Sequence, residues 1–298
     1  MNRRVRALDK LDLTVREGEV FGLLGPNGAG KSTTIKILLN LVRQSSGTAL
    51  VFGREPSSAD ARRLLGYLPE NPAPYEYLTG REFVTLAATL GGVSSADRPA
   101  RVSQVIEMVG MGQHASLQIR RYSKGMLQRI CLAQAIVHRP KLLILDEPTS
   151  GLDPVGRRQI RDLILEERRN GTTILFCTHV IPDVEAVCDR IAVLVGGNRV
   201  REGTVNELVT SSVPLVEVTV ESLSREKFDA LGVPFNEVHA IGERLLVRTE
   251  DAHTQALLQK VLAAGGRVTR LLPARFSLED LFIQAMNESH HRVGGRLL

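Results

Sequence analysis

A short glycine-rich segment near the start of the chain constrains the fold more than any other feature of the sequence. Residues 20–24 are apolar or glycine and predict a buried strand, and residues 32–41 carry apolar side chains at helical spacing. Residues 25–31 contain three glycines, which suits a tight turn between that strand and that helix. A strand, a loop and a helix therefore follow one another in close succession.

Later apolar stretches continue this pattern. Residues 142–145, 172–177 and 191–195 predict three more buried strands, each separated from the next by helical or loop sequence. Buried strands that alternate with helices predict an α/β fold with a mostly parallel sheet.

A helical insertion interrupts the alternation. Over about residues 75–135 strand signals are absent and helical signals take over, which predicts a helical subdomain. Its first helix should begin at Thr79, because Glu82 three residues later completes a capping box.

The sequence changes character after Leu208, where a polar stretch with a proline predicts a hinge. Beyond it, alternating and helical patterns predict the order β-α-β-β-α-β, which suggests a small α+β, ferredoxin-like unit. A last helix should start at Ser277, with Asp280 in the capping-box position. We therefore expect one domain over residues 1–210 and a C-terminal accessory or regulatory domain over residues 211–298.

The composition is that of an ordinary folded protein. Of 298 residues, 43% are hydrophobic and 24% charged, and three cysteines show no metal-binding or disulfide spacing. The apolar runs are far shorter than the roughly 18–20 residues needed to cross a bilayer, and residues 1–4 do not open a signal segment. We expect a cytosolic chain of about two domains. Its net charge of +5 is compatible with an anionic membrane surface or nucleic acid as partner but is diagnostic of neither.

The glycine-rich turn also carries chemistry. Residues 25–32 satisfy the pattern GxxxxGK[ST] between a strand and a helix, the setting that this P-loop motif requires. Backbone N–H groups of the loop can converge on phosphate oxygens, Lys31 can reach the terminal phosphates, and Ser32 can bind Mg²⁺. An ordinary glycine-rich turn is the alternative. The residues expected to bind nucleotide here are Asn27, Gly28, Ala29, Gly30, Lys31, Ser32 and Thr33.

Two carboxylates follow the strand at 142–145. Asp146 and Glu147 should lie at the carboxyl end of that strand, where open α/β sheets bind their ligands. Asp146 would hold Mg²⁺ through water, and Glu147 would polarise the water that attacks the γ-phosphate. Strand ends often carry acidic residues, and a P-loop alone leaves kinase, GTPase and ATPase open.

Further motifs make the chain resemble the ATP-binding subunits of ABC transporters, over residues 6–208. Residues 122–126 look like a variant of that family's signature, in the form typical of the ABC-2-type export branch. Residues 148–153 match the run that leads into its D-loop, and Thr178 with His179 matches its switch histidine. The resemblance implies a P-loop NTPase core, a helical subdomain, and hydrolysis of ATP with Mg²⁺.

The same resemblance implies a head-to-tail dimer. Ser123 and Gly125 of one copy would bind the ATP held by the P-loop of the other, Asp153 would lie at the dimer contact, and His179 would contact the γ-phosphate. Without that dimer, Ser123 is a simple helix N-cap and Asp153 a turn residue. A monomer should hydrolyse ATP poorly.

The sequence departs from the family pattern at two places. Glu70 stands where the family commonly has a glutamine beside the transmembrane partner; we carry it over as a coupling residue near the nucleotide, the alternative being a solvated loop carboxylate. Asn2 stands where an aromatic residue that stacks on adenine is expected. Either other side chains hold adenine or the natural start lies upstream.

The resemblance thus implies an ATPase that powers an ABC-2-type membrane transporter, an exporter by its branch, as a homodimer docked on a separate integral membrane permease. It would lie on the inner face of the cell membrane, with no nucleic-acid partner. The main alternative is an ABC ATPase that moves nucleic acid or ribosomes, but such relatives carry two cassettes or very long coiled coils. A P-loop kinase or GTPase would have neither the signature-like segment nor His179.

Overall fold

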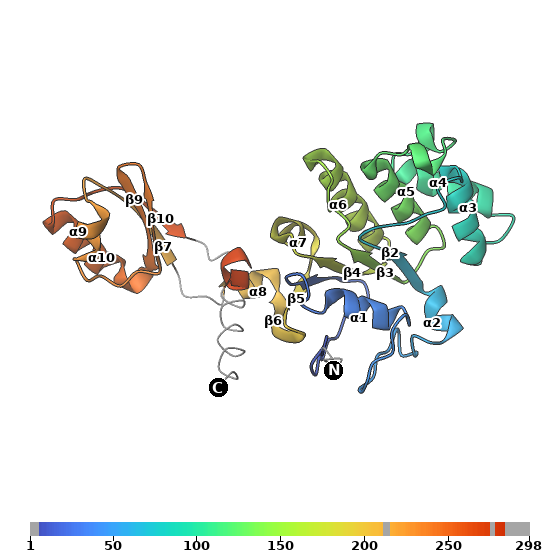
Figure 1. The fold of residues 1–298 in the computed structure, drawn as a ribbon, viewed down its shortest axis with the longest axis horizontal. Coiled ribbons are helices and arrows are strands. Elements are labelled where there is room, and N and C mark those ends of the chain that lie inside the picture. The colour runs from blue at the N-terminus through green and yellow to red at the C-terminus, as the bar shows by residue number, and fades with distance from the viewer. Residues whose placement is uncertain (1–5, 211–214, 275–277, 284–298) are drawn as a thin grey trace, which may run out of the picture. The chain divides into compact units, whose positions relative to one another are not determined.

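The computed structural model describes residues 6–210, 215–274 and 278–283 in two compact units (Figure 1). The chain passes from the first unit to the second between Val205 and Asn206, at the start of helix α8 (Val205–Thr210). No helix within these ranges is long and apolar enough to cross a membrane.

The first unit is built on a six-stranded sheet of order β2-β3-β4-β1-β5-β6. Its strands are β1 (Val20–Leu24), β2 (Leu65–Leu68), β3 (Leu142–Asp146), β4 (Thr173–Thr178), β5 (Arg190–Val195) and β6 (Asn198–Thr204). All neighbours are parallel except β6, which runs antiparallel to β5 at the edge. The expected α/β core with a mostly parallel sheet is therefore confirmed.

Helices cover both faces of this sheet. Figure 1 shows α1 (Lys31–Leu38) and α2 (Ala59–Arg63) on one face, with α6 (Pro154–Arg169) and α7 (Ile181–Val187) on the other. Alternate residues of β1 point to opposite faces, so Phe21 and Leu23 share an apolar cluster with Ile35 of α1. The buried strands and α1 together hold the loop between them in place.

A group of helices extends the first unit beside β2 (Figure 1). It contains α3 (Gly80–Leu90), α4 (Arg98–Met108) and α5 (Lys124–Ile136), which pack on one another. The capping box expected at the start of α3 is confirmed, because the Thr79 hydroxyl accepts a hydrogen bond from the Glu82 N–H while the Glu82 carboxylate accepts one from the Thr79 N–H. The 3-10 turns Gly112–His114 and Ile119–Arg121 connect α4 to α5.

The second unit has the element order β-α-β-β-α-β. Its elements are β7 (Leu215–Glu221), α9 (Arg225–Asp229), β8 (Glu237–Ile241), β9 (Arg244–Glu250), α10 (Asp251–Ala263) and β10 (Arg267–Ala274). They form an antiparallel sheet of order β10-β7-β9-β8, whose inward side chains pack in an apolar cluster that includes Phe228.

The last expected helix lies only partly within the described residues. Ser277 lies outside them, whereas residues 278–283 are helical. Leu278 and Leu281 are buried, and the Asp280 carboxylate lies 3.5 Å from Nη1 of Arg248 on β9.

Two strands of the first sheet were not predicted. β2 has only four residues, including a glycine, and its apolar run is too short to separate from loop sequence. β6 is largely polar and none of its residues is fully buried, because it forms the edge of the sheet. Neither strand has a strong periodic signal.

Candidate functional site

The glycine-rich loop joins the end of β1 to the first turn of α1. Gly28 and Gly30 have φ angles of 80° and 111°, a backbone region that residues with a Cβ rarely adopt. A Cβ on Gly30 would also lie only 2.5 Å from the Leu8 Cδ2 atom. The backbone conformation at Gly30 therefore favours glycine, and a Cβ there would also force the end of the Leu8 side chain to move.

Lys31 is folded back onto this loop. Its ammonium group donates to the carbonyl oxygen of Gly25 and to that of Pro26, at 3.3 Å for the latter. Lys31 is buried, whereas Ser32 is exposed and Thr33 half-buried in the same helical turn. Asn27 and Gly28 are exposed at the tip of the loop, so this edge of the sheet presents backbone N–H groups and a hydroxyl to solvent.

The two consecutive carboxylates lie at the same edge of the sheet. Asp146 ends β3, and the adjacent Glu147 has a φ angle of 49°, unusual for a residue other than glycine. The Glu147 N–H donates to the Cys177 carbonyl oxygen of β4 at 2.8 Å. Since β3, β4 and β1 are parallel neighbours, their carboxyl ends bring these acids to the phosphate loop.

The Glu147 side chain connects three parts of the site. Its Oε2 atom accepts a hydrogen bond from the Thr178 hydroxyl at 3.0 Å, and its Oε1 atom lies 2.8 Å from Nδ1 of His179. Nζ of Lys31 lies 3.8 Å from the same Oε1 atom. The structure therefore brings Lys31, Glu147 and His179 together.

Burial dominates the electrostatics of Asp146. Loss of water, followed by the nearby negative charges of Glu147 and Glu70, raises the pKa of Asp146 to about 6, although Lys31 opposes the shift. Burial and the Asp146 charge likewise raise the pKa of Tyr67 to about 12. A cation would relieve this excess of negative charge, so the Asp146 carboxylate and the Ser32 hydroxyl, both hard oxygen donors, fit Mg²⁺.

Other predicted site residues lie apart from this cluster. Ser123 is exposed and caps α5, since its hydroxyl accepts from the Met126 N–H at 3.3 Å, and Gly125 follows in the first turn. Asp153 is exposed and caps α6, where its Oδ1 atom accepts from the Gly156 N–H at 2.8 Å. Among the described residues, Ser123 and Asp153 are hydrogen-bonded to their own helices and not to the phosphate loop.

Of the two residues that depart from the family pattern, the structure describes only Glu70. Glu70 is exposed two residues after β2, at the edge of the sheet that carries Asp146, and its charge reaches that carboxyl. Asn2 lies outside the described residues.

Several contacts around the predicted site residues were not predicted from the sequence. Thr178 bonds to Glu147, the Thr149 hydroxyl donates to the Asp183 carboxylate at 2.6 Å, and the Gln128 amide donates to the Pro148 carbonyl oxygen at 3.0 Å. These residues are polar and lie within or near the predicted motifs, but their burial, which marks them as paired, is visible only in the structure.

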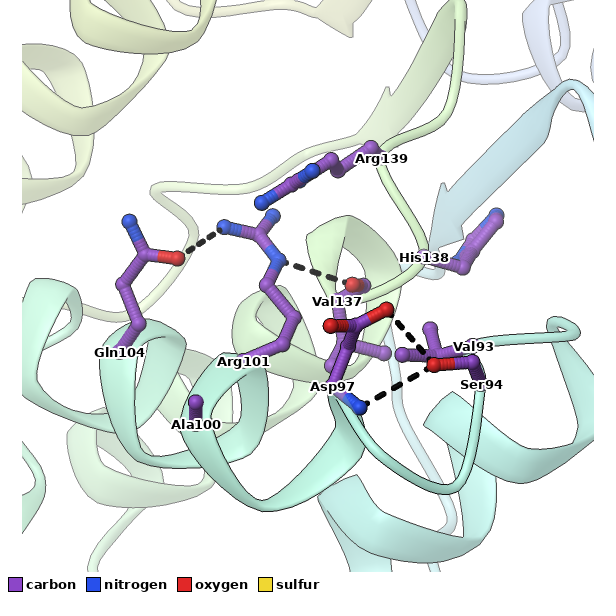
Figure 2. Close-up of a pocket in the computed structure, with 9 residues that line it drawn as sticks. All are labelled: Val93, Ser94, Asp97, Ala100, Arg101, Gln104, Val137, His138 and Arg139. Carbon is purple, nitrogen blue, oxygen red and sulfur yellow. Dashed lines mark hydrogen bonds between the residues drawn. The ribbon is translucent and has the colours of Figure 1, made fainter.

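A separate pocket of about 570 Å³ lies at the junction of α4 and α5 (Figure 2). There Arg101 donates to the carbonyl oxygens of Ile136 and Val137 and so caps the C-terminal end of α5. Ser123 caps the opposite end of this 13-residue helix, roughly 20 Å away. The pocket is therefore remote from Ser123 and contributes none of the predicted site residues.

Comparison with known proteins places the chain in a family. Residues 8–150 match the ABC transporter family. An uncharacterized ABC transporter ATP-binding protein of Nostoc sp. is 38% identical over 98% of this chain and 88% of its own length. A fluoroquinolones export ATP-binding protein of Mycobacterium tuberculosis is 41% identical over 68% of this chain and 66% of its own.

Solved structures of ABC transporter cassettes are also similar to this chain. The bacterial ABC transporter cassette MJ0796, solved as a dimer, superimposes with a TM-score of 0.63 at 26% identity, over 68% of this chain and 93% of that one. The same cassette in a post-hydrolysis state with ADP and Pi gives a TM-score of 0.63 at 25% identity, with the same coverage. The chain therefore belongs to the ABC transporter family as an ATP-binding subunit, and it is an ATPase.

Proposed function

We propose that this subunit hydrolyses ATP to power an ABC-2-type exporter, working as a dimer docked on a separate membrane permease. The observation that carries the catalytic part is the Glu147 carboxylate, held by Thr178 and His179 beside Lys31 at the phosphate loop. The form of the signature at residues 122–126 and the export-named relative support the export branch.

Glu147 is the proposed general base. Its carboxylate is buried and aligned by Thr178, so it can accept a proton from a water molecule placed for attack on the γ-phosphate. His179 is exposed enough to turn from Glu147 to a phosphate oxygen. Lys31 must leave the carbonyl oxygens of Gly25 and Pro26 to reach the phosphates.

Nucleotide and metal would be held at the loop. The backbone from Asn27 to Thr33 faces the phosphates at the N-terminus of α1, where the helix dipole favours negative charge. Mg²⁺ held by Ser32 and Asp146 would neutralise charge on the β- and γ-phosphates.

A second copy would complete the site. At the N-terminus of α5, Ser123 is exposed and Gly125 is half-buried. At the N-terminus of α6, Asp153 is exposed. Ser123 and Gly125 would meet the nucleotide of a partner copy, and Asp153 would lie at the contact between the copies. The dimeric state printed for MJ0796 supports a homodimer of this kind.

Docking on a permease would use the surface near Glu70. Tyr75 and Tyr77, close to it in sequence, have 68% and 77% of their surface exposed, which suits a partner that covers them. The subunit would thus sit peripherally on the inner face of the membrane, and no nucleic-acid partner is required.

The second unit would be an accessory domain of ferredoxin-like fold. Its element order and its sheet order β10-β7-β9-β8 support that assignment. On this proposal residues 1–210 form the ATP-binding domain, with the helical subdomain at about 75–135, and residues 211–298 form the accessory domain.

The test is a pull-down of tagged Glu147→Gln protein from detergent-solubilised native membranes with ATP and Mg²⁺. We expect a multi-spanning membrane protein to co-purify in stoichiometric amount. Glu166→Gln, an exposed glutamate of α6, is the matched control and should hydrolyse ATP normally. Recovery of ribosomal or nucleic-acid components without a membrane protein would overturn the proposal.

A further inference from the structure

Thr149 and Asp183 form a buried contact between the segment that follows Glu147 and helix α7. The Thr149 hydroxyl donates to Oδ2 of Asp183 at 2.6 Å, and Thr149 and Asp183 are only 1% and 2% exposed. The other carboxylate oxygen, Oδ1, accepts from Nη1 of Arg161 on α6 at 3.3 Å. The Asp183 carboxylate is thus paired on both oxygens.

This contact is the second of two between the same pair of segments. The first joins the Glu147 carboxylate to Thr178 and His179. The second joins Thr149, two residues after Glu147, to Asp183, four residues after His179. The segment from Glu147 to Thr149 is therefore joined to the segment from His179 to Asp183 at both of its ends.

The two contacts differ in how permanent they can be. The His179 side chain is 54% exposed, and its bond to Glu147 must be exchanged if His179 is to contact a nucleotide. The Thr149–Asp183 bond is buried and uses no atom that nucleotide must displace. It can therefore hold the two segments in register while Glu147 and His179 change partners.

The backbone at Glu147 needs such support. Its φ angle of 49° lies in a region that costs a non-glycine residue energy, and such a conformation persists only where the surroundings enforce it. On the side of α5, the buried Gln128 amide donates to the Pro148 carbonyl oxygen. The segment after Glu147 is therefore fixed by α5 on one side and by α7 on the other.

We propose that Thr149 and Asp183 are a positioning pair, which keeps the Glu147 carboxylate aimed at the attacking water when His179 and Lys31 turn to the nucleotide. This role rests on the proposed function, in which Glu147 is the base. The pair is buried and would act through the backbone of residues 147–149.

The test removes one hydroxyl with little change of shape. Thr149→Val should lower kcat about 10- to 100-fold, because small misplacements of a catalytic group have effects of that size. The KM for ATP should change less than about threefold, because the phosphate loop is untouched. Thr149→Ser keeps the hydroxyl and should retain most of the activity.

A matched control tests whether the loss of any buried threonine hydroxyl would lower kcat. Thr249 in the second unit is 0% exposed and its hydroxyl donates to the Pro234 carbonyl oxygen at 3.0 Å. Thr249→Val should leave kcat unchanged. If Thr149→Val does not fold, Thr149→Cys, with a weak S–H donor, should show the same loss of kcat.

The decisive measurement repeats Thr149→Val in the Glu147→Gln background. A positioning role predicts no further fall in the residual hydrolysis there, since the base that the pair aims is already gone. An equal fall in both backgrounds, or a wild-type kcat for Thr149→Val, overturns the role. Wild-type turnover by Glu147→Gln alone would instead overturn the base assignment, on which the pair depends.

Discussion

Nζ of Lys31 lies 3.8 Å from Oε1 of Glu147, and the two side chains are only 7% and 6% exposed. The lysine expected to bind phosphate therefore compensates the charge of the proposed base. Nucleotide phosphates would compete with Glu147 for Lys31. The same lysine would thus contribute both to the stability of the fold and to the binding of ATP.

Lys31→Met should weaken ATP binding at least about 100-fold and also lower the free energy of unfolding by up to about 3 kcal/mol. The second effect arises because Glu147 would be left buried with less compensation. Adding Glu147→Gln should restore part of the lost stability but none of the binding. Urea unfolding and nucleotide titration of the single and double variants measure both quantities; equal unfolding midpoints for wild type and Lys31→Met would contradict the link.

Glu147→Gln should lower the hydrolysis rate by about 10³-fold, within the usual contribution of a general base. ATP binding should persist, because the amide oxygen still accepts from Thr178 and the phosphate loop is intact. Single-turnover hydrolysis and ATP binding at equilibrium are the measurements. Turnover near the wild-type rate would remove Glu147 as the base.

Asp146 should make the protein less stable as the pH rises, in solutions without nucleotide or Mg²⁺. Because its pKa of about 6 exceeds the ordinary value of 3.8, the folded state holds this proton more tightly than the unfolded chain. Stability is therefore lost as the pH rises from about 4 to about 6, by roughly 3 kcal/mol as an upper bound, and is not regained above that range.

The variant Asp146→Asn tests whether ionisation of Asp146 lowers the stability of the fold. It should raise the free energy of unfolding at about pH 8, with a smaller gain at about pH 5, while hydrolysis with Mg²⁺ is lost. Asp162, an exposed acid on α6, provides the control variant Asp162→Asn, which should change neither quantity. A gain that is the same at both pH values would show that the Asp146 charge is not its cause.

The sequence predicted the parts of the site whose residues are contiguous. The phosphate loop and Asp146 with Glu147 could be proposed because each adjoins a strand or helix with clear apolar periodicity, whereas His179 was proposed only from the resemblance to the family. The α3 capping box was found for the same reason, since Thr79 and Glu82 are only three residues apart.

Contacts between distant segments could not be predicted in this way. Thr149 and Asp183 are 34 residues apart, and Gln128 and Pro148 are 20 apart, so no local pattern records that they meet. Strand β6 has a polar sequence because it forms the sheet edge, and its place there follows only from its pairing with β5. Tertiary packing decides these features.

Ser123 allows the capping role to be separated from a role in the dimer. Aspartate and asparagine are both good helix N-caps, so Ser123→Asp and Ser123→Asn should leave the unfolding temperature of the isolated subunit nearly unchanged. Only Ser123→Asp brings a negative charge to the surface that would face the partner's ATP. In the Glu147→Gln background with ATP, Ser123→Asp should therefore stay monomeric where Ser123→Asn still dimerises, as measured by size-exclusion chromatography with light scattering. ATP-dependent dimers of the aspartate variant would place Ser123 away from the nucleotide and leave it as a helix cap alone.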